Sequence, residues 1–229
     1  MAITPEDEAR VSAILEQLDL SGWAVLVNGV TPLLGEVMRA GGSAALATLK
    51  IPAADELDLT NVVNADAAAF AAARGAELVG MRYDEAGALV ANPDASWAIT
   101  DSTRELLRGT VRQAIEEGWS AQQLGAAVES SYAFSATRAA MIGRTEIARA
   151  SEQGTLSGWR NSGVVDAVRW VLGSEHDDDV PGGDECDDNA EAGAIAIGEA
   201  FPSGDEAPPA HPNCICALEA VVSQEGDEQ

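Results

Sequence analysis

The chain has 229 residues, 46% of them hydrophobic, which is enough for one generous domain or two small ones with a real core. It carries 13 basic and 38 acidic residues, a formal net charge of −25. Binding to a nucleic-acid backbone needs a positive surface, so direct nucleic-acid binding is not expected. The chain has no apolar run of about 18 residues, and its acidic start lacks the features of a secretory signal, so neither a membrane-spanning helix nor export is expected.

The charge is unevenly distributed along the chain. Residues 171–229 hold 16 acidic residues and no Lys or Arg, and Lys50 is the only lysine among the 13 bases. A lysine-poor, acidic surface suits a cytoplasm of high ionic strength, where salt screens the repulsion between like charges. The other reading is that the acidity serves only solubility, and the sequence leaves both open.

The first 63 residues predict helices followed by a connector. Thr4 and Pro5 precede three acidic residues, which is the pattern of a helix start. The apolar face of this helix would consist of Val11, Ile14, Leu15 and Leu18. Residues 20–49 are apolar and rich in Gly and Ala, which predicts one or two helices that allow close backbone approach. Residues 51–63 contain Pro52 and are expected to form a connector.

The middle of the chain predicts a short hairpin between helices. Asn64 is expected to cap an Ala-rich helix that ends near Val79. Turn-forming residues at 84–87 and 92–94 flank Leu89 and Val90, which favours a hairpin there. Three further helices are expected, one capped by Asp101 or Ser102 and ending at Gly118, one capped by Ser120, and one from Ser135 to about Trp159.

The pattern changes after Gly163. Residues 165–172 and 194–197 alternate as short strands do, and the rest is crowded with Gly, Pro and Asp. The predicted fold is therefore a mostly α-helical body with a small α+β carboxy-terminal module of short strands and loops. We divide the chain into an amino-terminal helical segment (residues 1–63), a helical body (64–162) and the strand-and-loop module (163–220). The last part is an acidic tail (221–229) that is expected to be disordered.

The carboxy-terminal module has a cluster of metal-ligand residues. Residues 171–229 contain only ten large apolar side chains, and modules this small usually need a disulfide or a metal. The same segment holds all three cysteines and both histidines of the chain. Three thiolates and one imidazole form an accepted tetrahedral zinc set, so the candidate ligands are Cys186, His211, Cys214 and Cys216.

Other readings of the cluster remain open at this point. A disulfide would leave one of the three cysteines unpaired, and a Cys-x-Cys bridge is strained. Free buried thiols without a metal are the other alternative. His176 is a reserve ligand or simply a solvated side chain. The Asp177–Asp179 run lacks the spacing of a calcium-binding loop, which favours an exposed acidic loop.

Two segments of the sequence carry a family resemblance. Residues 138–150 form an expected helix that contains Arg144-Thr145-Glu146, followed by Trp170 on a strand. Residues 201–216 begin with Phe201-Pro-Ser-Gly204 and end with Pro208-Pro209-Ala210-His211-Pro212-Asn213-Cys214-Ile215-Cys216. In this order, the segments resemble the Mu F-like phage head morphogenesis family over about residues 65–220. That family typically has an Arg-Thr-Glu helix, a Trp before an acidic loop, and a Pro-Pro-x-His-Pro-x-Cys-x-Cys ending.

The chain departs from the family pattern at two positions. Ile215 stands where many members have Arg, and Asn189 stands where a Cys-x-x-Cys pair would end. The second departure leaves His211 as the expected fourth ligand. The resemblance implies a structural minor head protein without catalytic activity. It would lie in the virion head near the portal, assemble in the host cytoplasm, and contact the portal protein, the major capsid protein or other copies of itself.

An enzyme is the alternative class of function. A metal-dependent hydrolase would use His176, the Asp177–Asp179 run and the Cys/His cluster. The sequence contains no His-Glu-x-x-His, Gly-x-Ser-x-Gly, phosphate-binding or dinucleotide-binding motif. A zinc ion saturated by thiolates would also have no open position for water, which favours a structural role. We therefore expect no catalytic residues and at most one structural zinc ion.

Overall fold

The computed structural model describes residues 21–49, 53–174, 176 and 184–222, together with Ala9 and Ala13. The predicted helix that starts at Thr4, the Asp177–Asp179 run and all but the first two residues of the predicted tail lie outside the described residues. Within the described residues, no helix combines the length and the apolar character needed to cross a membrane.

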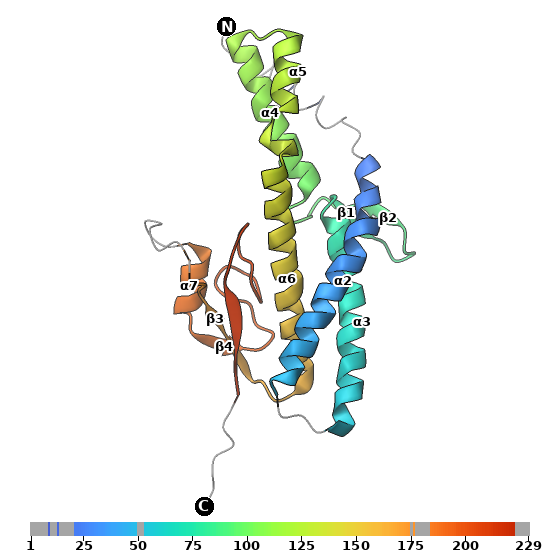
Figure 1. Cartoon of the computed structure of the whole chain (residues 1–229), viewed down its shortest axis with the longest axis vertical. Coiled ribbons are helices and arrows are strands. Elements are labelled where there is room, and N and C mark those ends of the chain that lie inside the picture. Colours follow the sequence, from blue (N-terminus) through green and yellow to red (C-terminus); the bar gives the residue numbers. More distant parts are fainter. Residues whose placement is uncertain are drawn as a thin grey trace, which may run out of the picture. The chain divides into compact units, whose positions relative to one another are not determined.

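The predicted fold class is confirmed: helices dominate, and two small antiparallel sheets of short strands accompany them (Figure 1). The helical elements of the described chain are η1 (Ser21–Trp23), α2 (Ala24–Ala47), α3 (Ala53–Glu77), α4 (Ile99–Glu117), α5 (Ala121–Glu129), η2 (Tyr132–Phe134), α6 (Ala136–Ser162) and α7 (Glu185–Glu191). The strands are β1 (Met81–Tyr83), β2 (Leu89–Ala91), β3 (Ala167–Val171), β4 (Ala194–Ala196) and β5 (Ala217–Val221).

The chain divides into two compact units that interleave along the sequence. Unit 1 consists of Met1–Thr31 and Ala72–Ala140, and unit 2 consists of Pro32–Ala71 and Met141–Gln229. Helices α2, α3 and α6 each cross a unit boundary. The four consecutive segments predicted from the sequence, 1–63, 64–162, 163–220 and 221–229, divide the chain differently. That division stays a prediction.

Several predicted boundaries agree with the structure because the capping chemistry is local. Gly118 ends α4 in the left-handed conformation, with φ 68°. Ser120 caps α5 through a capping box with Gln123. The Ser135 hydroxyl accepts a hydrogen bond from the backbone N–H of Arg138 at 3.1 Å and so caps α6. The predicted hairpin is also present, with β1 paired antiparallel to β2.

Three predicted boundaries are wrong, and one of them is the cap at Asn64, which lies in the interior of α3. Residues 51–63 were expected to form a connector, but α3 begins at Ala53 and continues through this stretch, and Val63 is almost fully buried. The sequence does carry a helix-start pattern there, because Pro52 is closely followed by the acidic residues Asp55 and Glu56. Helix α4 begins at Ile99, with Ala98 at its N-cap, so neither Asp101 nor Ser102 caps it.

In unit 1, Arg138 connects the beginning of α6 to α4 and η2. Its buried guanidinium donates hydrogen bonds to the Thr103 hydroxyl at 3.1 Å, the Ser102 hydroxyl at 2.7 Å and the Ala133 carbonyl oxygen at 2.8 Å. A buried guanidinium is costly unless its donors are satisfied. These bonds therefore fix where the two helices begin relative to the short 3-10 turn.

In unit 2, α2 and α6 cross with their backbones in direct contact. A Cβ atom added to Gly154 would clash with the carbonyl oxygen of Met38, and one added to Gly158 would lie 2.8 Å from the carbonyl oxygen of Gly42. Only glycine allows this approach, as expected from the Gly- and Ala-rich composition of residues 20–49. Close approach of helix backbones brings many atoms into van der Waals contact and so stabilises the crossing.

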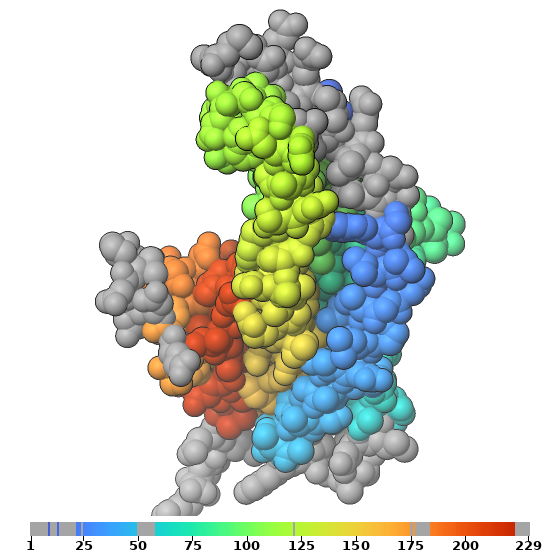
Figure 2. Space-filling model, turned by 45° about the horizontal axis from the view of Figure 1, so that its top comes forward, coloured from blue at the N-terminus to red at the C-terminus, as the bar shows by residue number. Residues whose placement is uncertain are grey.

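The carboxy-terminal sheet has the order β4-β3-β5, with β3 pairing antiparallel to both neighbours. The predicted strands correspond to β3 and β4, whereas β5 and α7 were not expected from the sequence. The buried core of the module continues onto α6 through Leu156 and Trp159. Within unit 2, α6 has this module on one side and α2 with α3 on the other (Figures 1 and 2).

Candidate metal centre

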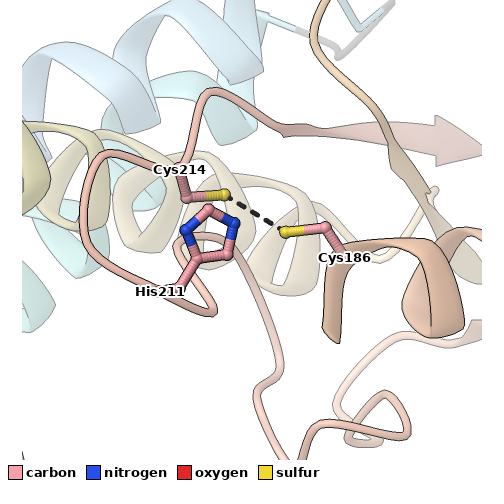
Figure 3. Close-up of side chains that lie close together, drawn as sticks. All are labelled: Cys186, His211 and Cys214. Atoms are coloured by element: carbon pink, nitrogen blue, oxygen red, sulfur yellow. Dashed lines mark hydrogen bonds between the residues drawn. The ribbon is translucent and has the colours of Figure 1, made fainter. Parts of the chain in front are cut away.

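Three of the four predicted ligands come together in unit 2. One ligand atom from each of Cys186, His211 and Cys214 lies within 4.8 Å of the others. Cys186 comes from α7, whereas His211 and Cys214 come from the loop before β5, and their side chains point toward one another (Figure 3). The two sulfur atoms are 3.5 Å apart, close to the roughly 3.8 Å between two sulfurs on one tetrahedral zinc ion.

Helix α7 presents Cys186 to this cluster. Asp184 is its N-cap residue, and its carboxylate accepts hydrogen bonds from the backbone N–H groups of Cys186 and Asp187. The Asp187 carboxylate accepts from the backbone N–H of Asp184 in return, which completes a capping box. This reciprocal cap starts a helix of seven residues and turns Cys186, which is fully buried, toward the core.

The loop that carries His211 and Cys214 is docked on α6. The Thr145 hydroxyl accepts a hydrogen bond from the backbone N–H of Asn213 at 3.0 Å, and the Arg144 guanidinium donates to the Asn213 side-chain oxygen at 2.9 Å. Asn213 has φ 60°, a left-handed conformation that asparagine tolerates better than most residues. The Arg-Thr-Glu segment of α6 therefore holds the tight turn that places the two ligands.

His211 has an imidazole nitrogen that suits a metal ion. Its Nδ1 lies 3.0 Å from the carbonyl oxygen of Pro212, which can only accept, so Nδ1 carries a proton. Its Nε2 is buried, makes no hydrogen bond among the described residues, and lies 3.3 Å from Oδ2 of Asp184. A backbone carbonyl that fixes the tautomer in this way is the usual outer partner of a metal-ligating histidine. The donor set therefore fits a soft or borderline cation.

Cys216 lies outside this three-residue group but beside its two thiols. Hydrogen bonds with Cys214 and with Cys216, followed by burial, raise the pKa of the Cys186 thiol. Hydrogen bonds with Cys186 and then Cys214 lower the pKa of Cys216, and the Gly173 N–H and the Trp170 indole contribute to this lowering. The three thiols are therefore close enough to shift one another's pKa values. The assignment of Cys216 as the fourth ligand stays a prediction.

Asn189 occupies the position where the family pattern has its second cysteine. It is fully buried, and its side-chain amide exchanges two hydrogen bonds of 2.9 Å with Ser203. The amide is thus satisfied within the loop that follows β4, outside the thiol cluster. Asn189 therefore makes a polar packing contact at this position.

His176, the predicted reserve ligand, lies beside α7. Its side chain is only 6% exposed, and its Nε2 is 3.1 Å from Asp187 Oδ1 and 3.7 Å from Asp184 Oδ1. The pKa of His176 is raised, because the hydrogen bond to Asp187 and the charges of both carboxylates outweigh the opposing effect of burial, which is the largest single contribution. His176 is therefore neither a solvated side chain nor part of the Cys186–His211–Cys214 group.

The cysteines are free thiols in this structure, with no disulfide among the described residues. Two thiols and an imidazole within 4.8 Å can hold one zinc ion, and the neighbouring thiol of Cys216 can complete a tetrahedral set. Such a set is closed to water, which is the property of a structural site. The Asp177–Asp179 run that a hydrolase would need lies outside the described residues.

No protein-family model, no curated protein and no solved structure matches this chain. The resemblance to the Mu F-like family therefore depends on the residues quoted from the sequence.

Proposed function

We propose that this chain is a structural minor head protein of a tailed virus, located at the portal vertex or capsid interior and acting in head assembly. The observation that carries the proposal is that the two segments with the family resemblance pack against each other. Residues 144–149 of α6 contact residues 209–213, which lie 60 to 69 positions further along the chain. A pattern that holds a fold together accounts for the resemblance without any catalytic role.

The burial of Thr145 and Glu146 supports a structural role for the Arg-Thr-Glu segment. Thr145 and Glu146 are 4% and 6% exposed. The Thr145 hydroxyl donates a hydrogen bond to the Met141 carbonyl oxygen and accepts one from the Asn213 N–H. The Arg144 guanidinium is directed at Asn213. Groups committed to packing in this way are poor candidates for an acid, a base or a nucleophile, which must reach a substrate.

We further propose that Cys186, His211, Cys214 and Cys216 hold one structural zinc ion. The ion would tie α7 to the loop before β5, two segments that the sheet does not otherwise join. Zinc binding to such sites contributes roughly 10–16 kcal/mol of apparent free energy at neutral pH, and this energy is coupled to folding. The metal ion would then fix the fold of the carboxy-terminal module, which packs on α6.

The proposed partners are the portal protein, the major capsid protein and further copies of the chain. Helix α2 offers exposed apolar side chains at Val25, Leu26 and Leu33, which are 68%, 42% and 49% exposed. They are suited to contacts with another protein, whereas the net charge of −25 disfavours nucleic acid. Single Leu33→Ser and Val25→Ser variants should weaken portal association in a pull-down, while the matched surface variant Ser43→Ala should not.

The direct test is mass spectrometry of density-purified virions. The protein should be present at a fixed ratio to the portal protein and should be absent from the soluble fraction after lysis. A chain that is expressed during infection but never found in purified particles would exclude the proposal. A parallel turnover screen with zinc-loaded protein tests the hydrolase alternative, and the head-protein proposal requires that it show no activity.

A further inference from the structure

Asp184 contacts the candidate metal centre through both of its carboxylate oxygens. Oδ1 accepts hydrogen bonds from the backbone N–H groups of Cys186 at 2.7 Å and Asp187 at 3.2 Å. Oδ2 lies 3.3 Å from Nε2 of His211. One side chain therefore touches the backbone of one proposed ligand and the imidazole of another, although the two ligands are 25 positions apart in the sequence.

The contact between Asp184 and His211 has the geometry of two groups that face a common cation. The proton on His211 is on Nδ1, because the Pro212 carbonyl oxygen needs a donor. Nε2 then faces a carboxylate oxygen at 3.3 Å, and the two atoms attract each other only when positive charge lies between or beside them, supplied either by a second proton on the imidazole or by a bound cation. Two N and O ligands at about 2.0–2.2 Å from one tetrahedral ion are roughly 3.3–3.5 Å apart.

His176 does not account for this arrangement. Its Nε2 is nearer to Asp187, at 3.1 Å, than to Asp184, at 3.7 Å, and it faces Oδ1 of Asp184. Oδ2 of Asp184 is the oxygen that faces His211. The two histidines therefore use different oxygens of the same carboxylate, and the charge on Oδ2 is directed toward the thiol and imidazole cluster.

We propose that Asp184 belongs to the metal centre, where it supplies carboxylate charge to the ion on the Nε2 side of His211 and fixes Cys186 for the same ion through the cap of α7. This inference rests on the proposed zinc centre. Carboxylates next to the ligands of a metal typically change its affinity 10- to 100-fold. Asp184 is a positioning and charge-supplying residue, and its effect should be larger than that of other acids on the same helix.

The test compares Asp184→Asn with Asp188→Asn in the full-length chain. Asparagine caps helices as well as aspartate does, so the first variant keeps the cap of α7 and loses only the charge. Asp188 is an exposed acid on the same helix, and its variant makes the same change in net charge. Zinc affinity is measured by competition with a chelator, and the ligand field is followed by the absorption spectrum of the cobalt(II)-substituted protein.

We expect Asp184→Asn to bind zinc at least about 10-fold more weakly and to shift the cobalt bands, and Asp188→Asn to stay within about 2-fold of the wild type. Equal affinities for the wild type and Asp184→Asn would overturn the inference while leaving the zinc centre in place. If the wild type itself binds no zinc, both ideas fail, and the head-protein assignment is still decided by the virion measurement. If Asp184→Asn does not fold, Asp184→Ser, which keeps a capping oxygen but is too short to reach His211, replaces it under the same criteria.

Discussion

The Thr145 hydroxyl accepts a hydrogen bond from the backbone N–H of Asn213 at 3.0 Å, across 68 positions of sequence. Thr145 is 4% exposed, and the same hydroxyl donates to the Met141 carbonyl oxygen within α6. One small polar side chain thus joins the central helix of unit 2 to the turn that carries the candidate metal ligands.

Thr145→Val should destabilise the carboxy-terminal module. Valine has the same shape as threonine but cannot accept the Asn213 N–H, and a buried donor left without a partner costs about 1–3 kcal/mol. Urea unfolding followed by tryptophan fluorescence measures the change, with Thr145→Ser as the control that keeps the hydroxyl. A free energy of unfolding that is equal in the valine variant and the wild type would show that the bond contributes nothing.

Gly154→Ala should weaken the crossing of α2 and α6. The new methyl group would meet the carbonyl oxygen of Met38, and the helices must move apart at a cost of roughly 1–3 kcal/mol or more. Gly143→Ala is the matched control on the same helix, because a Cβ atom there meets nothing within 4 Å. It should stabilise α6 by up to about 1 kcal/mol through helix propensity. Thermal unfolding of both variants gives the comparison, and a shift of the same sign in both would contradict the proposed close contact.

Cys214→Ser should abolish stoichiometric zinc binding and disorder the described residues after 171. Helices α4 and α5, which belong to unit 1, should remain folded. Metal analysis of protein purified without chelator and limited proteolysis followed by mass spectrometry report the two effects. Ile215→Ser changes the exposed neighbour and is the control. Zinc-free wild-type protein with the same protease resistance as the zinc-loaded form would exclude a structural metal.

Glu152→Gln should change how stability depends on pH. Burial raises the pKa of Glu152, and the Leu218 N–H that it accepts opposes this only partly. The folded state therefore holds this proton to higher pH than the unfolded chain does. The associated stability is fully present below the ordinary pKa of 4.5 and is lost as pH rises through the raised value.

Glutamine keeps the acceptor oxygen and has no charge to bury. The stability of Glu152→Gln relative to the wild type should therefore increase from acidic to neutral pH, as measured by urea unfolding at a series of pH values. Exposed Glu129→Gln, at the end of α5, provides the baseline for a surface acid. A pH-independent difference between Glu152→Gln and the wild type would mean that the burial of Glu152 has no energetic consequence.

The melting temperature should rise with salt if the acidity reflects a saline host. The 16 acidic residues of 171–229 have no basic residue in the same segment. A like-charge pair at 4 Å costs about 1 kcal/mol in water, and about 1 M salt shortens the screening length to about 3 Å. Melting curves between about 0.1 and 2 M potassium chloride test the idea. A constant melting temperature would favour the reading that the charge serves only solubility.

The helices were predictable where local chemistry decides them. Ser120, Ser135 and Gly118 act through their own backbone surroundings, so the sequence pattern was sufficient. Helix α7 was missed because its start depends on Asp184 and Asp187 capping each other in a segment that otherwise has loop composition. Strand β5 was missed because its partner strand β3 lies about 50 residues earlier in the chain, so no local pattern indicates the pairing.

Three of the four predicted ligands, Cys186, His211 and Cys214, come together in the structure, whereas the surroundings of the site could not be predicted. Spacing alone brought His211, Cys214 and Cys216 into one cluster, and the chemistry of thiols connected Cys186 to them. Nothing in the sequence placed Asp184 against His211, because that contact depends on how α7 docks. The carboxy-terminal module also has a larger hydrophobic core than the ten large apolar side chains of residues 171–229 indicate. Leu156, Trp159 and Trp170, which precede that segment, belong to the same core.

The central position of β3 has a consequence for how the protein is made. Its partner β5 is about 50 residues further on, with Arg169 opposite Glu219, so β3 emerges from the ribosome long before its second neighbour exists. Contacts of such high sequence separation form late. Until Val221 has been synthesised, Trp170 lies at an open sheet edge with its core incomplete. A chain released at that stage would expose apolar surface and an unpaired strand, which is the combination that leads to aggregation.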